Sequence, residues 1–334
     1  MEKKLQSKVL YDPESRGRGT AAVDVVLVHG LDGDLVETWA HTTTDTKPLR
    51  RVVWPETLLP KVLPRARVLS FGYNGDIYHN NSVAGIRGNA GALLSHLRSL
   101  RYGVDQARPI VFVAHCLGGL IVKQALCFAD VDEHHQLIAS ATKGIMFFGT
   151  PHCGAEEAQW KRLAQRYSRL PGSRGQASLL LEALTRDSND LAEISEDFCH
   201  VAPKYRIVSF FEEVTWLNTG ELIVDMTSAR LDVYGERVVP VGADHLGICR
   251  FADDNDMTFM SVWQEVRDVA PASAEALEIA NEGDGGVGEK AELQSSDPVL
   301  REMPSVKGSA DETGEKGKRS KGRRSRSIRG IFGW

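Results

Sequence analysis

One cysteine stands where the sequence turns from an apolar segment into a stretch with helical spacing. The apolar segment 110–114 ends two positions before Cys116, and the helix-like segment 120–129 follows Cys116. A side chain raised on a tight turn between a strand and a helix needs small residues two positions before and after it, because the turn crowds its neighbours. Ala114 and Gly118 meet this need. The pattern differs from the usual G-x-S-x-G by an alanine and a cysteine, and it predicts a nucleophile elbow with Cys116 at its tip.

A thiol on such a turn can attack a carbonyl carbon as a serine hydroxyl does, and its thiolate forms more easily than an alkoxide. The attack creates a negatively charged oxygen, which two backbone amides must stabilise. We expect these to be the amide of Leu117, directly after the cysteine, and the amide of Leu31, because the apolar segment 25–28 runs into His29-Gly30-Leu31. The alternative is that Cys116 is a small apolar residue in a turn without activity.

A general base is expected late in the chain, and His245 follows the last predicted strand. The acid that orients this base should lie between the nucleophile and the base. Glu212 is the first candidate, because it directly follows the apolar segment 205–211 and would project at the sheet edge where such sites form. Asp225 is the second candidate, although it could instead cap the turn that follows it. Glu221 lies in the same window.

Three further histidines stand beside these motifs. We interpret His29 and His115 as structural neighbours of the oxyanion loop and of the elbow, and His152 as a loop residue near the mouth of the pocket. The histidines lack ligand-like spacing with cysteines or acids, so we expect no metal and no cofactor.

These residues need a scaffold that brings distant segments together, and the hydrophobic pattern predicts one. Short β-branched runs alternate with segments whose apolar residues recur every three or four positions. This is typical of an α/β protein with a mostly parallel central sheet and helices on both faces. The predicted strands are 23–28, 66–71, 109–114, 144–149, 205–211 and 237–241, and the clearest helices are 86–102 and 120–129.

Composition divides the chain into three parts. Residues 1–20 are predicted to be a flexible segment, residues 21–270 one α/β domain, and residues 271–334 a disordered tail, because the tail holds few large apolar side chains. Within the domain, residues 155–200 are polar and helix-prone with a sparse apolar stripe. This stretch indicates either a helical cap insertion or an ordinary pair of packing helices.

Composition also limits the class of protein. The 334 residues are 42% hydrophobic, which is enough for a buried core, and the longest apolar runs fall short of the ~18 residues that a membrane span needs. The first residues lack the apolar stretch of a secretory signal, and the five cysteines contain no CxxC pair. We therefore expect free thiols in a reducing compartment, and an intracellular, cytoplasmic protein.

The end of the chain has a charge pattern of its own. After Glu315 every ionisable side chain is basic, and the apolar residues Ile328, Ile331, Phe332 and Trp334 lie within this segment. Such a segment predicts a salt-sensitive, peripheral attraction to an anionic membrane surface. A solvated basic tail or a nuclear-localisation-like patch is the alternative. With a net charge of −5 for the whole chain, we expect no specific nucleic-acid binding.

Taken together, the motifs resemble those of the serine-active-site-containing, lipase-like α/β-hydrolases. The likeness extends over residues 23–251, and its motifs occur in the expected order. They are His29-Gly30-Leu31, Phe71-Gly72-Tyr73, Ala114-His115-Cys116-Leu117-Gly118-Gly119, Phe148-Gly149-Thr150-Pro151-His152, Ser209-Phe210-Phe211-Glu212 and Ala243-Asp244-His245-Leu246-Gly247. The family usually has serine where this chain has Cys116.

The resemblance implies an α/β-hydrolase fold and a carboxylic ester hydrolase of the lipase, esterase or thioesterase type, acting on a small-molecule or lipid ester. On this chain the nucleophile falls on Cys116, the base on His245 and the acid on Glu212, with Asp225 as the alternative acid. For some members the resemblance also implies association with mitochondria or the endoplasmic reticulum. Because a cysteine replaces the serine, a second hypothesis stays open, namely a catalytically degenerate hydrolase fold that serves binding or signalling.

Overall fold

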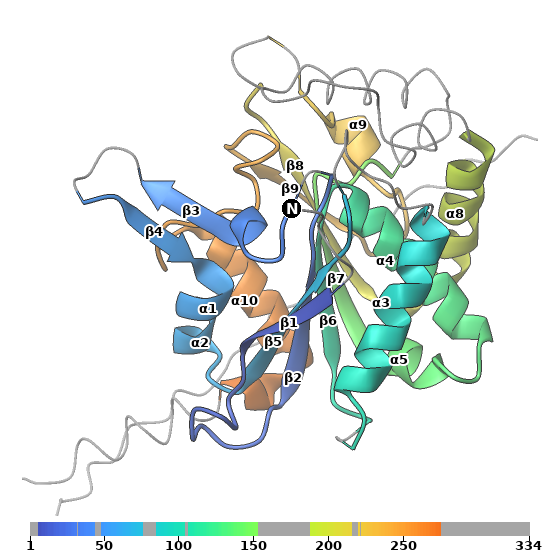
Figure 1. The fold of residues 1–334 in the computed structure, drawn as a ribbon. Coiled ribbons are helices and arrows are strands. Elements are labelled where there is room, and N and C mark those ends of the chain that lie inside the picture. The colour runs from blue at the N-terminus through green and yellow to red at the C-terminus, as the bar shows by residue number, and fades with distance from the viewer. Residues whose placement is uncertain are drawn as a thin grey trace, which may run out of the picture. The chain divides into compact units, whose positions relative to one another are not determined.

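The described part of the chain is built on one large sheet with helices on both faces (Figure 1). The computed structural model describes residues 6–31, 33–43, 48–75, 85–103, 106–152, 188–215, 220 and 222–274. The chain divides into two units, Met1–Val287 and Gly288–Trp334, and all the described residues belong to the first.

The sheet has seven strands in the order β1-β5-β2-β6-β7-β8-β9. β1 is antiparallel to β5, and the other neighbouring strands of this sheet are parallel to one another. The strands span Gln6–Tyr11 (β1), Val23–Val28 (β2), Ala66–Gly72 (β5), Ile110–His115 (β6), Thr142–Phe148 (β7), Arg206–Glu212 (β8) and Arg237–Val241 (β9). A separate hairpin pairs β3, Ala40–Thr43, with β4, Arg50–Val53. The mostly parallel sheet predicted from the sequence is therefore confirmed.

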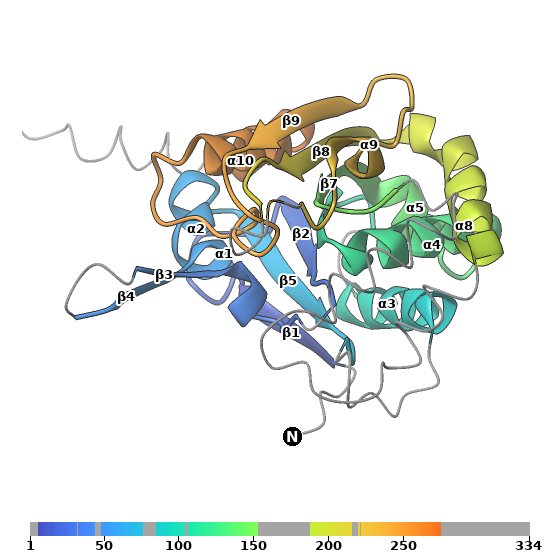
Figure 2. The same cartoon turned by 90° about the horizontal axis from the view of Figure 1, so that it is seen from above.

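The side chains of β2 alternate between two cores, one on each face of the sheet. Val26 and Val28 pack with α3 and α4 in the first core, and Val25 and Leu27 pack with α1, α2 and α10 in the second. Figures 1 and 2 show these helices on opposite sides of the strands. The first face carries α3 (Ile86–Leu100), α4 (Leu117–Val131), α5 (Gln136–Ala141) and α8 (Ser188–Val201), and the second carries α1 (Trp54–Thr57), α2 (Leu59–Val62) and α10 (Met257–Val269). Shorter helical segments are α9 (Met226–Ala229), η1 (Glu37–Trp39), η2 (Ala202–Lys204) and η4 (Pro271–Ser273).

Only the end of the predicted cap lies among the described residues. Residues 153–187 lie outside them, whereas residues 188–201 form α8. Ile194 and Phe198 of this helix are buried in the same core as α4. Residues 188–201 therefore form a helix that packs on the domain.

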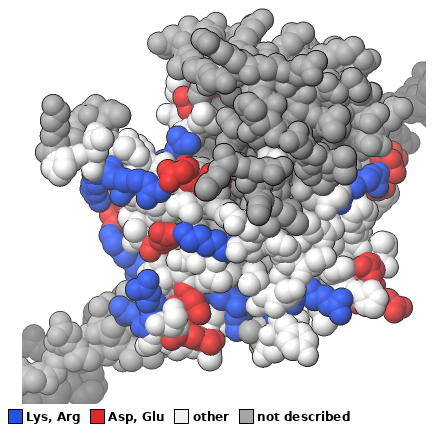
Figure 3. Space-filling view, viewed as in Figure 1, with Lys and Arg blue, Asp and Glu red and all other residues white. Residues whose placement is uncertain are grey.

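The surface of the described residues carries both signs of charge. In the view of Figure 3, lysine and arginine side chains alternate with aspartate and glutamate side chains around the described part of the domain. None of the helices in the described ranges is long and apolar enough to cross a membrane. The predicted disordered tail begins at residue 271, but residues 271–274 are described and include η4, in which Ser273 is buried. Residues 275–334 lie outside the described residues.

Candidate active site

The candidate site residues meet at one edge of the sheet because their strands are parallel. His29 follows β2, Cys116 follows β6, Glu212 ends β8, and His245 lies in the turns after β9. Parallel strands place their carboxyl ends at the same edge, so residues far apart in the sequence come together there.

Cys116 has the backbone conformation of a residue at the tip of a sharp turn. Its φ is 51° and its ψ is −123°, a combination that a non-glycine residue adopts only under strain. It is the N-cap residue of α4, and its N–H donates to the carbonyl of Phe148 at a distance of 2.9 Å. The turn is held because α4 lies directly on β2: a Cβ added to Gly118 would lie 2.4 Å from the carbonyl oxygen of Val28. The thiol is therefore raised on a rigid strand-turn-helix unit.

His245 lies between the cysteine and a carboxylate. Its side chain is 1% exposed, it is hydrogen-bonded to the Cys116 side chain, and its Nδ1 lies 3.5 Å from Oε2 of Glu212. At that distance the contact with Glu212 is an ion pair rather than a short hydrogen bond. Burial alone would lower the pKa of His245, but the charges of Glu212 and Cys116 outweigh burial and raise this pKa to about 10. The site therefore favours the imidazolium form of His245.

Glu212 and Asp225, the two candidate acids, have different surroundings. Glu212 is fully buried beside His245, and its Oε1 accepts a hydrogen bond from the N–H of Val224. Asp225 is exposed, and its carboxylate accepts the N–H of Ser228 at 2.9 Å as the N-cap of α9. The structure brings Glu212 together with Cys116 and His245, and it places Asp225 at the helix cap instead. Glu221 lies outside the described residues.

The two predicted oxyanion amides flank the cysteine. Leu117 is the first residue of α4, so its N–H has no acceptor within the helix. Leu31 follows Gly30, and the backbone of Gly30 lies close to Cys116: an added Cβ there would lie 2.7 Å from Cβ of Cys116. Glycine is required at position 30 because the loop after β2 passes directly over the cysteine. Both leucine side chains are buried.

His115 links the turn at Cys116 to the loop that carries His245. Its Nε2 donates to the backbone carbonyl of His245 at 2.8 Å, and the two rings are 4.9 Å apart. Burial, and then the positive charge of His245, hold the pKa of His115 well below its usual value. His115 is therefore a neutral neighbour of the elbow.

His152 lies deeper than the sequence suggested. Its side chain is 2% exposed, and its ring contacts the ring of Phe147 at a centroid distance of 4.5 Å. Its backbone N–H donates to the carbonyl of Ser228 at 2.6 Å. Burial, and then the charge of Lys123, hold the pKa of His152 well below its usual value. We expected a loop residue near a pocket mouth, and the structure has a buried residue after β7.

Two residues at the site received no role from the sequence. Gly149 has a φ of 52°, and a Cβ there would lie 3.0 Å from both Cε1 and Nδ1 of His245. Tyr73 stacks on His29 with a ring centroid distance of 4.5 Å. The motifs Phe71-Gly72-Tyr73 and Phe148-Gly149-Thr150 already stood out, but only the folded chain shows what these two residues touch.

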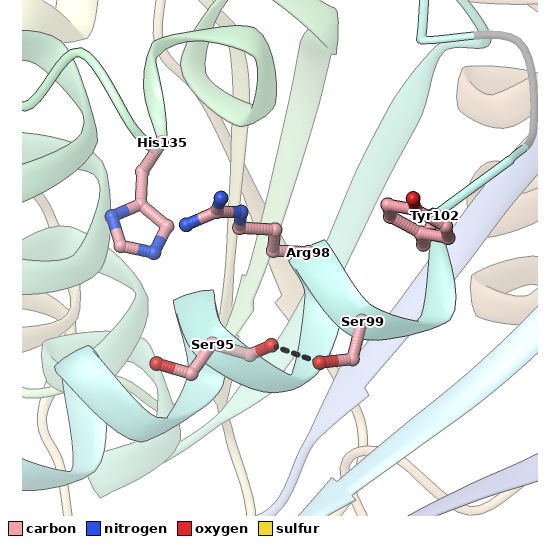
Figure 4. A pocket seen from close by; sticks show the side chains of 5 residues that line it. All are labelled: Ser95, Arg98, Ser99, Tyr102 and His135. Atoms are coloured by element: carbon pink, nitrogen blue, oxygen red, sulfur yellow. Dashed lines mark hydrogen bonds between the residues drawn. The ribbon is translucent and has the colours of Figure 1, made fainter.

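A surface cavity of about 530 Å³ lies elsewhere, by the C-terminal end of α3 (Figure 4). The hydroxyl of Ser99 donates to the carbonyl of Ser95 within the helix, and Tyr102 is 88% exposed. The cavity is lined by Ser95, Arg98, Ser99, Tyr102 and His135. It contains none of the residues gathered around Cys116 and is not part of the candidate active site.

The strand order, the antiparallel first strand and a nucleophile elbow after β6 define the protein as an α/β-hydrolase. A sequence model of one family in this class matches residues 24–198. The chain belongs to that family, which is described as "Putative serine esterase (DUF676)". The family description names a serine, whereas the elbow of this chain carries Cys116.

Curated relatives are similar over much of this chain. Protein SERAC1 of Danio rerio is 28% identical over 275 residues, which cover 78% of this chain and 41% of that protein. Protein SERAC1 of Homo sapiens is 28% identical over 287 residues, which cover 80% of this chain and 42% of that protein. The chain thus spans about two fifths of the length of these relatives.

Solved structures with a similar backbone include two esterases. One is a carboxylesterase of the thaumarchaeon Nitrososphaera gargenis, with 9% identity, a TM-score of 0.46, and coverage of 81% of this chain and 95% of the other. Another is a thermophilic esterase of Thermogutta terrifontis, with 15% identity, a TM-score of 0.44, and coverage of 80% and 94%. Membership of the family rests on the family model and not on these likenesses.

Proposed function

We propose that this chain hydrolyses carboxylic esters or thioesters with Cys116 as the nucleophile. The observation that carries the proposal is a cysteine in the conformation of an elbow, hydrogen-bonded to a histidine that is ion-paired with Glu212. A buried carboxylate and a buried imidazole are costly to keep together unless they pair, so a fold that only needed to be stable would gain little from them. Membership of an esterase family supports the same reading.

In the proposed reaction the Cys116 thiolate attacks the carbonyl carbon of the ester, and the carbonyl oxygen becomes an oxyanion held by the Leu31 and Leu117 amides. The C–O or C–S bond to the leaving group then breaks, and His245 gives that group a proton, leaving an acyl-cysteine. A water molecule loses a proton to His245 and attacks the acyl carbon, which releases the acid and returns the thiolate. Glu212 holds the imidazolium throughout.

The raised pKa of His245 supports an imidazolium as the resting form of this side chain. The proposed cysteine mechanism therefore uses the charged histidine first as a proton donor, whereas a serine enzyme uses a neutral histidine first as a base.

The proposal can be tested on the purified full chain with nitrophenyl esters and thioesters of short and medium acyl length. We expect wild type to release nitrophenol with a burst of one equivalent, and Cys116→Ala to show no burst. Cys116→Ser should keep or gain ester hydrolysis, because serine fits the same turn. Cys199→Ala, which removes an exposed thiol on α8, is the matched control and should behave as wild type.

A folded wild type and a folded Cys116→Ser variant that are both inert towards the whole panel would contradict the proposal. That outcome would favour the hydrolase fold as a binding or signalling module.

We further propose that the basic segment after Glu315 attaches the chain to anionic membranes, such as those of mitochondria or the endoplasmic reticulum. Each basic residue near an anionic surface contributes ~1 kcal/mol, and Phe332 and Trp334 can add a small apolar anchor. We expect the full chain to co-sediment with vesicles containing phosphatidylserine at low salt, and a chain ending at Glu315 to stay in the supernatant. Equal binding of the two chains would exclude the segment as the anchor.

A further inference from the structure

The direction of the Leu31 amide is set by the carbonyl of the residue before it. In a trans peptide the C=O of one residue and the N–H of the next lie in one plane and point in opposite directions. The carbonyl oxygen of Gly30 lies 2.8 Å from Nδ1 of His29, and it accepts the N–H of Gly33 at 3.2 Å. These two donors fix the plane of the Gly30–Leu31 peptide. The N–H of Leu31 therefore points away from the side on which His29 Nδ1 and the N–H of Gly33 lie.

The Nδ1 atom of His29 must carry a proton for this contact, because a carbonyl oxygen only accepts. A neutral imidazole that donates from Nδ1 must accept at Nε2. Here Nε2 accepts the backbone N–H of Tyr73 at 3.3 Å. Tyr73 therefore selects the tautomer of His29 that can hold the Gly30 carbonyl.

Tyr73 also holds the histidine in place with its side chain. Its ring stacks on the His29 ring at 4.5 Å with an interplanar angle of 6°, and its hydroxyl donates to the carbonyl oxygen of His29 at 3.0 Å. Burial, and then the charge of Cys116, raise the pKa of Tyr73 well above its usual value, so this hydroxyl keeps its proton and remains a donor.

The backbone at two glycines packs closely against His29 and Gly30. A Cβ on Gly33 would lie 2.7 Å from Nδ1 of His29, and a Cβ on Gly75 would lie 3.0 Å from the carbonyl oxygen of Gly30. The loop after β2 and the loop after β5 thus close around one imidazole. Three contacts from Tyr73 and one from Gly33 all act on the same two residues, His29 and Gly30.

We propose that the stacked pair of Tyr73 and His29 positions the Leu31 N–H towards the oxyanion that forms beside Cys116. Both are positioning residues, because they act through the Gly30–Leu31 peptide and do not themselves contact the oxyanion. The inference rests on the proposed function. It adds to that function a second layer of residues, one in the loop after β2 and one in the loop after β5, that keeps the oxyanion amide aimed before any substrate arrives.

The test compares two reactions of Cys116 in the full chain. Acylation by a nitrophenyl ester passes through an oxyanion, whereas alkylation by iodoacetamide displaces iodide at a tetrahedral carbon and forms none. In His29→Phe, which keeps a ring but loses the donor, we expect acylation to slow by roughly 100-fold and alkylation to stay within about twofold of wild type. His29→Asn can again present an N–H near the position of Nδ1, and it should recover part of the acylation rate.

Tyr73→Phe gives a second, milder test, because it keeps the stack and the backbone N–H and loses only the hydroxyl. We expect acylation to slow by roughly tenfold, with alkylation unchanged. Tyr11→Phe is its matched control: it also removes a tyrosine hydroxyl that donates to a backbone carbonyl, that of Pro64 at 2.9 Å, at the other end of β5. Both of its rates should equal those of wild type.

Three results would overturn the inference. Wild-type acylation rates in both His29→Phe and Tyr73→Phe would remove the positioning role. Equal losses of acylation and alkylation in a folded Tyr73→Phe would mean that the pair supports the site as a whole and not the oxyanion amide. A wild type that is alkylated at Cys116 but never acylated would overturn the proposed function itself, and the positioning role with it.

Discussion

The two carboxylates that the sequence offered as partners for the histidine show how surroundings decide the role of a residue. Glu212 is buried, faces His245 and accepts one backbone N–H. Asp225 is exposed and accepts the N–H of Ser228 at the start of α9. Removing each should therefore affect a different property of the protein.

For Glu212→Gln we expect acylation of Cys116 by a nitrophenyl ester to slow by roughly 100-fold. The amide oxygen can still accept the N–H of Val224, but the charge that stabilises the imidazolium is gone, so the pKa of His245 should fall. For Asp225→Ala we expect the opposite, a loss of about 1 kcal/mol of unfolding free energy with wild-type acylation. Urea unfolding and burst kinetics measure the two effects. Slow acylation in Asp225→Ala together with wild-type acylation in Glu212→Gln would make Asp225 the orienting acid in place of Glu212.

The sequence was informative about residues at the ends of strands. Cys116, His245 and Glu212 stood out because each follows an apolar run, and the structure brings their side chains together, while their catalytic roles remain predictions. Tyr73 and Gly149 could not be assigned in this way. What they do depends on contacts with His29 and with His245, which belong to other strands, and a single sequence does not reveal which loops touch.

At the scale of the elements, the close approach of α4 to β2 shapes the site. Gly118 meets the carbonyls of Val28 and His29, and a Cβ on Gly119 would lie 2.2 Å from Oγ1 of Thr150. Backbone atoms cannot move aside as a flexible side chain can. Two glycines let α4 lie close against the sheet. This allows the helix to start at Leu117, with Cys116 at the tip of the turn before it.

This contact reverses the usual effect of replacing glycine in a helix. Alanine normally stabilises a helix interior by ~1 kcal/mol over glycine, but Gly118→Ala should lower the unfolding free energy by roughly 1–3 kcal/mol because its Cβ overlaps two carbonyls. Gly144→Ala in β7 is the matched control: its Cβ would lie 3.7 Å from the nearest atom, the carbonyl oxygen of Arg206. We expect its stability to change by less than about 0.5 kcal/mol. Urea denaturation of both variants checks this, and equal stabilities would contradict it.

Buried elements were easier to predict than exposed ones. The strand at 23–28 has the same bounds in the structure, since all its residues are buried and its sequence is almost wholly apolar. β1 and the β3–β4 hairpin were not predicted, because their short, partly exposed sequences mix polar and apolar residues without clear alternation. Helix α4 starts at Leu117, three residues before the predicted start, where two glycines weaken the helical signal in the sequence.

At the scale of the whole molecule, the buried histidines predict how stability depends on pH. An unfolded histidine loses its proton near pH 6.5, whereas His245 keeps its proton in the folded protein up to about pH 10. Between these values the folded state holds more protons, so the free energy of unfolding should fall as the pH rises. His115 and His152 have lowered pKa values, so they stay neutral when folded and should reduce stability as the pH falls below 6.5.

We therefore expect the unfolding free energy to be largest near pH 6.5 and lower at both pH 5.5 and pH 8.0, as measured by urea denaturation. In His245→Gln the decline from pH 6.5 to 8.0 should disappear, while the decline on the acid side should remain. Measurements up to pH 8.0 stay below the pKa of an unfolded cysteine, ~8.5, whereas burial raises the pKa of folded Cys249 to about 12. A wild type that gains stability between pH 6.5 and 8.0 would contradict a charged His245.

The hydrogen bond from His115 to the carbonyl of His245 joins residues that are 130 positions apart. A ribosome adds about 5–20 residues per second, so on the order of ten seconds pass between the synthesis of Cys116 and that of His245. During this time Cys116 exists without the histidine that we propose as its partner. The proposed pair is assembled only when the last strand of the described sheet has been translated.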